Sequence, residues 1–314
     1  MLLHSTRGGN VQALHEIIIF LNGYLWGPPM LILLFGTHLF LTFRLKVIQR
    51  YTWLAIKLSL KRDKESEGDV SQFGALTTAL AATIGTGNIV GVATAVALGG
   101  PGAVLWCWLT GVFGMATKYA EAVLSVKYRV KTSDGTMLGG PMYALENGLQ
   151  MKWLAIIFSL CTSFAAFGIG NMVQANSIAS LVKETFNISP VVSGLVLSFF
   201  IGIVILGGIR FIANTCEALV PFMAFFYVAG CAVILVLNAE YILPAIILIF
   251  KSAFTPHAAG GGFVGASVMM AARYGIARGL FSNESGLGSA PIVAAAAQTR
   301  NPVRQALVSS TGTF

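Results

Sequence analysis

Two polar, glycine-containing strings interrupt long apolar stretches of the sequence, and their residue types could bind a small charged solute. The first is Gly85-Thr86-Gly87-Asn88, at the midpoint of the apolar stretch 73–99. Each glycine lowers helix propensity by about 1 kcal/mol relative to alanine. Unpaired backbone groups inside a bilayer cost more, so a break there is tolerated only where it lines a cavity or meets a ligand. The string therefore predicts a broken helix with a binding site at the break.

The second string occupies positions 278–291 of the apolar stretch 277–298, and it combines Ser282, Asn283 and Glu284 with three glycines and a proline. Glycine-interrupted apolar segments in corresponding positions of two halves are the sequence feature that best indicates the substrate site of a transporter. The two strings lie five spans apart. That spacing fits an inverted repeat whose first helices are both broken.

A helix break presents two sets of backbone groups to a ligand. The half-helix that begins after Gly85–Gly87 offers free N–H groups and the positive end of its dipole to a carboxylate. Carbonyl groups at the end of the preceding half, with the hydroxyls of Thr83 and Thr86, suit a hard cation such as Na⁺. The side-chain amides of Asn88 and Asn283 could orient either ligand.

Several polar side chains near these strings admit both a functional and a structural interpretation. Glu284 either faces a cation or a substrate ammonium group, or it caps a helix or pairs with Arg278. Asn171 and Gln174 lie three residues apart on one helix face, where they either line the cavity or join two helices by hydrogen bonds.

Two further patterns have a structural interpretation of similar or greater weight. Lys118 and Glu121, also three apart, are interpreted as an ion pair within one helix, with a gate as the alternative. The small residues of Gly85–Gly91 could serve close helix packing instead of binding. His38 and His257 have no carboxylate or cysteine at ligand spacing, so no metal site is expected.

The elements that must position these residues are helices in a membrane. Of the 314 residues, 56% are hydrophobic and only 10% are charged, against about 25% charged in an average soluble domain. Lipid must therefore be the solvent for much of the chain. The net charge of +8 comes from basic residues in loops beside apolar stretches, which is typical of membrane topology, so no nucleic-acid partner is expected.

A helix needs about 20 apolar residues to cross the hydrocarbon. We predict spans at 23–43, 73–99, 101–126, 153–175, 191–208, 211–238 and 277–298, with a partial or re-entrant outer element at 241–265. Residues 44–69 contain seven Lys and Arg, so this loop is placed in the cytoplasm, and the other basic loops then fall on the same side. The predicted location is the cell inner (plasma) membrane, with multiple spans.

Six strings of this sequence resemble the alanine or glycine:cation symporter family of bacteria and archaea. They are Ala79–Ala95 (ALAATIGTGNIVGVATA), Gly99–Ala103 (GGPGA), Trp108–Gly111 (WLTG), Ala116–Glu121 (ATKYAE), Gly139–Tyr143 (GGPMY) and Arg278–Pro291. Several of them are long and unusual, and they are dispersed from about residue 26 to the end. The resemblance is therefore specific.

The resemblance implies an all-α integral membrane protein of the leucine-transporter type, with a five-plus-five inverted repeat and an extra N-terminal helix. It implies uptake of alanine or glycine with Na⁺ by alternating access, with no cofactor besides the co-transported Na⁺. Carried over motif by motif, it assigns substrate binding to Gly85, Thr86, Gly87 and Asn88 at the first break, and to Phe281, Ser282 and Asn283 at the second. Phe281 would form a wall of a small pocket.

To these residues the sequence itself adds Gln174 as a substrate contact and Thr83, Thr86 and Glu284 as ion-coupling residues. The expected segments are 1–22 (extracellular), 23–43 (extra helix), 44–72 (basic cytoplasmic loop), 73–238 (first repeat), 239–276 (outer re-entrant or interfacial segment) and 277–314 (start of the second repeat). Since members of the family are longer, we expect further spans beyond Phe314 and an incomplete second repeat.

Alternative functions remain open. A proton-coupled carrier of a similar solute would use Glu284 or Glu121 to carry the proton, and a fragment without transport activity is a further alternative. An enzyme is not expected, because no His–carboxylate pair, nucleophile elbow or phosphate loop occurs. A channel would be expected to show a filter motif that forms a ring rather than two matched breaks.

Overall fold

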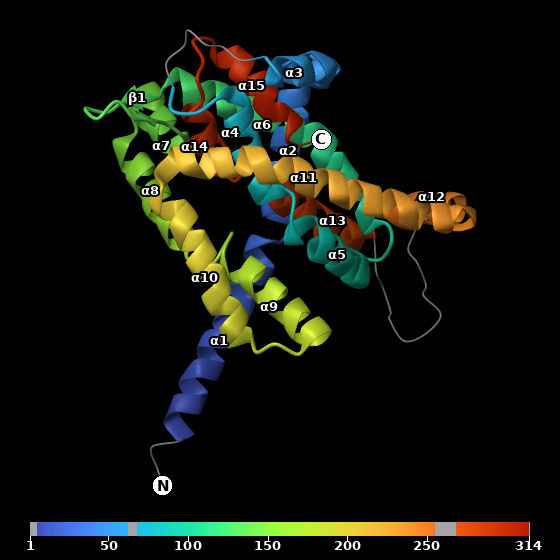
Figure 1. Ribbon diagram of the computed structural model, residues 1–314. Coiled ribbons are helices and arrows are strands. Elements are labelled where there is room, and N and C mark those ends of the chain that lie inside the picture. Colours follow the sequence, from blue (N-terminus) through green and yellow to red (C-terminus); the bar gives the residue numbers. More distant parts are fainter. Residues whose placement is uncertain (1–4, 62–67, 255–267, 314) are drawn as a thin grey trace.

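The computed structural model describes residues 5–61, 68–254 and 268–313, and it is all-α apart from one short hairpin (Figure 1). In chain order the elements are α1 (Ser5–Leu25), α2 (Pro28–Arg44), the 3₁₀ turn η1 (Ile48–Tyr51), α3 (Thr52–Ser59), α4 (Gln72–Thr83), the π-helical turn η2 (Gly87–Gly91), α5 (Val92–Gly99), α6 (Ala103–Lys127), β1 (Val130–Lys131), β2 (Met137–Leu138), α7 (Pro141–Tyr143), the π-helical turn η3 (Ala144–Gly148), α8 (Lys152–Ala166), α9 (Met172–Phe186), α10 (Pro190–Leu206), α11 (Gly208–Leu237), α12 (Ala239–Phe254), α13 (Val268–Asn283), α14 (Ala290–Ala295) and α15 (Pro302–Thr311). The strands β1 and β2 pair antiparallel.

Long apolar helices are present within the described residues. By length and composition, two of these helical segments could cross a membrane: residues 15–44 and α11, each 30 residues long. The pair formed by α4 and residues 87–99 counts as a third if it is one span, and its two parts are bent by 45°. The predicted break inside 73–99 is therefore confirmed. The helices α8 and α10 are apolar but shorter.

Three predicted spans match single helices closely, namely α6, α10 and α11. The predicted span 23–43 begins instead in the last turn of α1, which ends at Leu25, and continues as α2, which starts at Pro28. Proline is tolerated at the first position of a helix because the N–H group that it lacks would have no partner there. Of the predicted outer element 241–265, α12 covers the first part, and residues 255–267 lie outside the described residues.

The prediction of one span over 153–175 is wrong, because two helices, α8 and α9, occupy this stretch. They are separated by residues 167–171, where Gly170 adopts a φ of +92°. A residue with a Cβ rarely adopts this conformation, and glycine adopts it at little cost. The Asn171 side chain then caps α9 by accepting a hydrogen bond from the Met172 N–H group. Helices α8 and α9 are therefore a third place where a predicted span is interrupted, although the stretch is apolar over most of its length.

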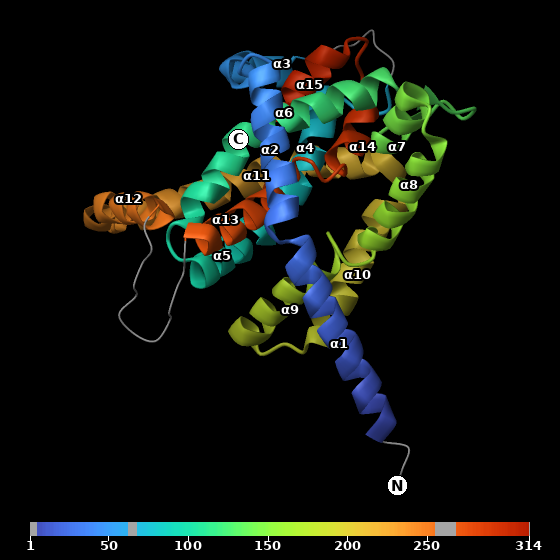
Figure 2. The ribbon, with the colours of Figure 1, turned by 180° about the vertical axis from the view of Figure 1, so that it is seen from behind.

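Helix α6 lies at the centre of the packing, and its most extensive contact is with α13 (Figures 1 and 2). Two glycines of α13, Gly275 and Gly279, face α6 so closely that no side chain fits between the helices. A Cβ at Gly275 would overlap the Ala103 carbonyl and the Trp106 side chain, and one at Gly279 would overlap Thr110. Small residues four apart allow such close approach between helices in membranes.

The outer surface of the molecule is strongly apolar. On α10 and α11, large side chains such as Leu206, Phe225 and Val236 have exposed fractions of 90%, 74% and 75%. An exposed apolar surface of this extent is typical of a surface that contacts lipid rather than water. The fold is that of a helical membrane protein.

The two broken helices are tied together at one end of the molecule. The N–H group of Asp69, just before α4, donates to the Ala296 carbonyl (2.8 Å), and the N–H group of Gln298 donates to the Val70 carbonyl (2.7 Å). The Arg129 guanidinium adds hydrogen bonds of 2.8 Å to the carbonyls of Ala295, Ala297 and Thr299. The start of the first broken helix therefore lies beside the end of the second.

Candidate functional site

The two helix breaks meet each other in the interior. The side-chain amide of Asn88 donates to the Thr83 carbonyl across the first break (2.7 Å), and its oxygen accepts a hydrogen bond from the Ser282 hydroxyl of the second broken helix. Beside this contact, a Cβ on Gly87 would lie 3.6 Å from the Ser282 Cα. Segments almost two hundred positions apart in the sequence thus form one polar centre.

Local sequence explains the first break. Helix α4 ends at Thr83 because Ile84 adopts an extended conformation, with ψ of 97°. The next helical segment starts when the Asn88 N–H group bonds to the Gly85 carbonyl (3.0 Å). The N–H groups just before it form the N-terminal end of that segment, which carries a partial positive charge.

The second break depends on backbone conformations that few residues adopt. Between α13 and α14, Glu284, Gly286 and Gly288 have φ values of +55°, +87° and +78°. The two glycines reach this region without strain, whereas Glu284 is held there by its surroundings. The carboxylate of Glu284 accepts a hydrogen bond from the Ser289 hydroxyl (3.1 Å). The ion pair with Arg278, which the sequence left open, is not present among the described residues.

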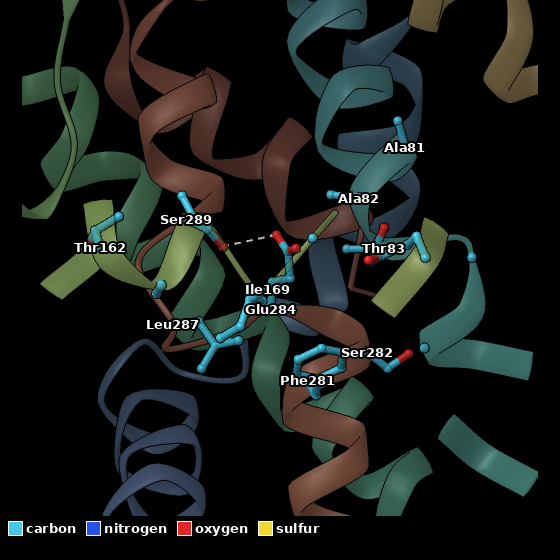
Figure 3. A pocket seen from close by; sticks show the side chains of 16 residues that line it. Ala81, Ala82, Thr83, Thr162, Ile169, Phe281, Ser282, Glu284, Leu287 and Ser289 are labelled. Atoms are coloured by element: carbon cyan, nitrogen blue, oxygen red, sulfur yellow. Dashed lines mark hydrogen bonds between the residues drawn. The ribbon is translucent and has the colours of Figure 1, made fainter. Parts of the chain in front are cut away.

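A cavity of about 350 Å³ opens between the two breaks (Figure 3). Its lining residues come from α4 and the first break, from α8 with the segment that follows it, from α9, and from α13 with the second break: Ala81, Ala82, Thr83, Gly85, Gly87, Thr162, Ala165, Ala166, Ile169, Gly170, Gln174, Phe281, Ser282, Glu284, Leu287 and Ser289. Most of this lining is small and apolar, with a few polar groups. Such a composition is typical of a site for a small ligand.

Two buried oxygens at this site have no hydrogen-bond partner within the described part of the chain. One is Oε1 of Gln174, a residue of the cavity wall, and the other is the hydroxyl of Thr86 in the first break. Buried polar atoms in proteins almost always have partners, so an orphaned atom at a cavity indicates a missing ligand or water. Both positions could therefore contact a bound solute or ion.

Seven of the residues predicted from the sequence line the cavity: Thr83, Gly85, Gly87, Gln174, Phe281, Ser282 and Glu284. Thr86 is adjacent in the chain but does not line it. Asn88 and Asn283 line a separate hollow of about 350 Å³ on the other side of Ser282. The structure thus places the two asparagines behind the cavity wall, where they organise the breaks.

The sequence did not indicate the contribution of α8 and of the segment after it. Thr162, Ala165 and Ile169 form one wall of the cavity, and Figure 3 shows Thr162 on the side opposite Thr83 and Ser282. The available signal was the pair Gly168 and Gly170, which interrupts the apolar stretch.

The alternatives for the neighbouring polar pairs are resolved by their contacts. Asn171 donates to the Ala166 carbonyl (3.1 Å) in addition to capping α9, so only Gln174 of that pair lines the cavity. The ammonium of Lys118 donates to the Asn283 carbonyl (3.0 Å) and also attracts the carboxylates of Glu284 and Glu121. The attraction that the sequence predicts between Lys118 and Glu121 is therefore present, without a direct ion pair among the described residues.

Comparisons with known proteins give a consistent result. The model of the sodium:alanine symporter family matches residues 11–314. The chain is 55% identical to a sodium/alanine symporter of Methanococcus maripaludis over 93% of its own length and 65% of the relative. It is 41% identical to a putative sodium/proton-dependent alanine carrier protein of Bacillus subtilis (93% and 60% of the two lengths), and 35% identical to a probable sodium/glutamine symporter of the same organism (96% and 62%). The chain thus spans less than two-thirds of the length of these relatives.

Proposed function

Because the chain belongs to the sodium:alanine symporter family, we propose that it carries alanine or glycine into the cell together with Na⁺, through the cavity between its two helix breaks. The family consists of transporters and not of enzymes. The observation that carries the proposal is the direct contact of the two breaks at a cavity of about 350 Å³. Broken helices that meet around a small cavity are the usual way in which transporters bind a solute.

The cavity has complementary groups for both ends of an amino acid. The solute carboxylate faces the N–H groups at the start of the segment after Gly85, where the helix dipole favours an anion. The solute ammonium faces the orphaned Gln174 oxygen and the carboxylate of Glu284. Phe281, together with alanines such as Ala165, limits the room for a side chain, which favours alanine and glycine.

The cation site is proposed at the end of α4. A hard cation prefers oxygen ligands, and the carbonyl end of α4 offers them beside the hydroxyl of Thr83, which lines the cavity. The buried hydroxyl of Thr86 has no partner within the described residues and is a further candidate ligand. Na⁺ at this position would lie next to the solute and would couple the two binding events.

The five-plus-five inverted repeat is proposed as the architecture. It is supported by the side-by-side arrangement of the first and second broken helices, whose opposite ends are joined through Val70 and Gln298. In this proposal residues 73–238 form the first repeat and residues 277–314 begin the second. The preceding helix is the extra one, the loop 44–72 faces the cytoplasm, and the protein resides in the inner membrane.

Uptake of radiolabelled alanine into proteoliposomes tests this function. The protein is reconstituted, and a Na⁺ gradient is imposed on one half of the sample and an equal K⁺ gradient on the other. We expect accumulation with Na⁺ alone, with glycine as a competitor. Equal uptake in both conditions, or no uptake by protein that elutes as a single folded species, would contradict sodium-coupled symport.

Proton coupling is the second candidate. Glu284 lies in the cavity wall, where a carboxylate could carry a proton, and one relative is named a sodium/proton-dependent alanine carrier. In the same proteoliposomes, a pH gradient without Na⁺ distinguishes the two. Accumulation driven by the pH gradient alone and lost in Glu284→Gln would favour the proton-coupled carrier.

Replacement of Phe281 by alanine is expected to change the solute preference. The Phe281 ring forms part of the cavity wall (Figure 3), so its removal enlarges the room for a solute side chain. Alanine binding should weaken by about tenfold, and larger neutral amino acids such as glutamine should begin to compete. The matched control is Phe164→Ala on α8, because that ring is 74% exposed and does not line the cavity. Unchanged competition profiles in Phe281→Ala would contradict the role of Phe281 in limiting the size of the solute.

A further inference from the structure

The chain changes direction where the span of α2 ends. Residues 15–44 are long and apolar enough to cross a membrane, so Arg44 lies where this span reaches the bilayer surface. The next residues, Lys46 and Val47, have φ values of +54° and +57°, a conformation that residues other than glycine seldom adopt. The chain then continues as η1 and α3, which Figure 2 shows at the upper end of α2, beside α15. Both elements therefore lie near the level of the bilayer surface.

One side of η1 and α3 is fixed to the rest of the protein. Ile48 and Ala55 are buried in a cluster with Leu307 of α15. The side-chain amide of Gln49 donates to the Val112 carbonyl of α6 (2.9 Å). These contacts hold the two elements in one orientation, and the opposite side consequently faces outward.

The outward side exposes large apolar side chains. Trp53 and Leu60 have exposed fractions of 67% and 72%, and Leu54 and Ile56 are exposed as well. Surfaces that face water rarely gather so many large apolar side chains in so short a segment. At a membrane surface, tryptophan lies at the level of the lipid head groups, and neighbouring apolar side chains lie among the first acyl carbons. The outward side of α3 fits this boundary.

The same segment is strongly basic. From Arg44 to Lys61 the sequence has five cationic residues and no acidic one. All five are exposed, and none forms an ion pair within the described part of the chain: Arg44, Lys46, Arg50, Lys57 and Lys61. Residues 62–67, of which the structure describes nothing, add two cations and three carboxylates, so the whole segment 44–67, with seven cationic and three acidic residues, has a net charge of +4. The surface therefore favours an anionic partner even when these carboxylates are counted.

Two of the cations lie over aromatic rings. The guanidinium carbon of Arg50 is 4.7 Å from the centroid of the Tyr51 ring, and its Nη2 donates to the Tyr51 hydroxyl (2.8 Å). The ammonium of Lys57 is 5.4 Å from the centroid of the Trp53 ring. Such contacts restrict the long side chains, so less conformational freedom is lost when the cation binds an anion. Each of these two cations is thus held beside an aromatic ring that suits the membrane surface.

We propose that residues 44–61 form a docking surface for anionic phospholipid. Arg50 and Lys57 bind the phosphate groups, and Trp53 and Leu60 insert beside them. Charge complementarity selects this occupant, because each Lys or Arg near a membrane surface favours lipids with a net negative charge. A zwitterionic lipid carries its own cation next to the phosphate and is attracted less. This docking does not depend on the proposed transport function.

Quenching of Trp53 fluorescence by brominated lipid in nanodiscs tests the proposal. Matched nanodiscs of zwitterionic lipid contain the same mole fraction of brominated phosphatidylglycerol, which is anionic, or brominated phosphatidylcholine, which is zwitterionic. Quenching is measured relative to unbrominated lipid. The Trp53 signal is the difference between each protein and the same protein with Trp53→Phe, because the chain has five tryptophans.

Three double variants are compared with wild type. Arg50→Gln with Lys57→Gln removes both cations, and Arg50→Lys with Lys57→Arg keeps both charges. The matched control, Lys152→Gln with Lys183→Gln, removes the same charge from exposed positions on α8 and α9. Each protein is first checked for monodisperse elution.

In wild type, phosphatidylglycerol should quench Trp53 about twofold more than phosphatidylcholine does, because the anionic lipid is enriched at this surface. The two lipids should quench equally when both cations are removed, whereas the charge-retaining variant and the control should keep the preference. High salt should reduce the preference, since exposed charges are screened. Equal quenching by the two lipids in wild type would overturn the proposal, and so would a preference that survives removal of both cations.

Two further arms keep the outcome decisive. If the variant without Arg50 and Lys57 is not monodisperse, Lys46→Gln with Lys61→Gln replaces it and should reduce the preference, and an unchanged preference would overturn the proposal. Inorganic phosphate is compared with chloride at equal ionic strength, and both should reduce the preference equally by screening. Loss in phosphate alone would indicate a site for the free anion and would overturn the assignment to lipid. The readout needs no transport, so its failure is distinguishable from a failure of the proposed function.

Discussion

Asn88→Ala should weaken alanine binding by about a hundredfold while the protein remains folded. The Asn88 side chain holds the two breaks together, because its amide donates to the Thr83 carbonyl (2.7 Å) and its oxygen accepts from the Ser282 hydroxyl. The substitution takes these partners from the Thr83 carbonyl and the Ser282 hydroxyl, which are partly buried. An unsatisfied group of this kind costs about 1–3 kcal/mol. Because alanine binds only when both breaks are ordered, part of its binding free energy must offset this cost, and its affinity falls.

Titration calorimetry with alanine in Na⁺ measures this effect. Ser282→Ala removes one of the two hydrogen bonds, so it should weaken binding less, by about tenfold. The matched control is Asn238→Ala, because Asn238 is exposed and, within the described part of the chain, its side-chain amide bonds only to the Ile234 carbonyl in the last turn of α11. Affinity within about threefold of wild type in Asn88→Ala would mean that the bridge between the breaks does not organise the site.

Gly275→Leu should prevent the protein from folding. The backbone of α13 lies against α6 at this point, and a Cβ on Gly275 would overlap the Ala103 carbonyl and the Trp106 side chain. Backbone atoms of a packed helix cannot move aside as a flexible side chain can. The two helices would have to separate along their most extensive contact, at a cost of about 3 kcal/mol or more.

The yield of monodisperse protein and its thermal midpoint measure this change. Gly230→Leu is the matched control, because Gly230 lies within a helix, α11, and no atom of the described residues lies within 4 Å of a Cβ built there. That variant should give wild-type yield and an equal or higher midpoint, since leucine favours a helix more than glycine does. Normal folding of Gly275→Leu would show that α6 and α13 are not in close contact.

Local signals were sufficient to predict the first break and the class of the fold. Gly85 and Gly87 lower helix propensity, and the apolar stretch around them is long enough to span a membrane. Both features depend only on neighbouring residues. The contact of Asn88 with Ser282 joins positions 194 apart, and no sequence pattern specifies it, so only the existence of two polar strings could be predicted.

Other features were missed because competing interactions override local rules. The stretch 153–175 has the length and composition of one span, yet Gly168 and Gly170 allow a break within it. Residues beside that break form one wall of the cavity. Lys118 and Glu121 have the spacing of an ion pair within a helix. The ammonium of Lys118 also bonds to the Asn283 carbonyl at the second break, and that tertiary contact cannot be read from spacing alone.

Protection of a cysteine in the cavity wall tests most directly whether the solute binds in the cavity between the breaks. Ala165→Cys is introduced on α8 after the four native cysteines, which are all free, have been replaced by serine. Ser133→Cys, in the exposed turn between β1 and β2, is the control. The rate of alkylation by a small soluble thiol reagent is measured with and without alanine, in Na⁺ and in K⁺.

We expect saturating alanine in Na⁺ to slow alkylation of Ala165→Cys by about tenfold or more, since a bound solute excludes the reagent from the cavity. Alanine in K⁺ should have no such effect, and Ser133→Cys should react at one rate in every condition. If Ala165→Cys binds alanine in Na⁺ and its alkylation rate nevertheless does not change, the solute site lies elsewhere and the account is wrong.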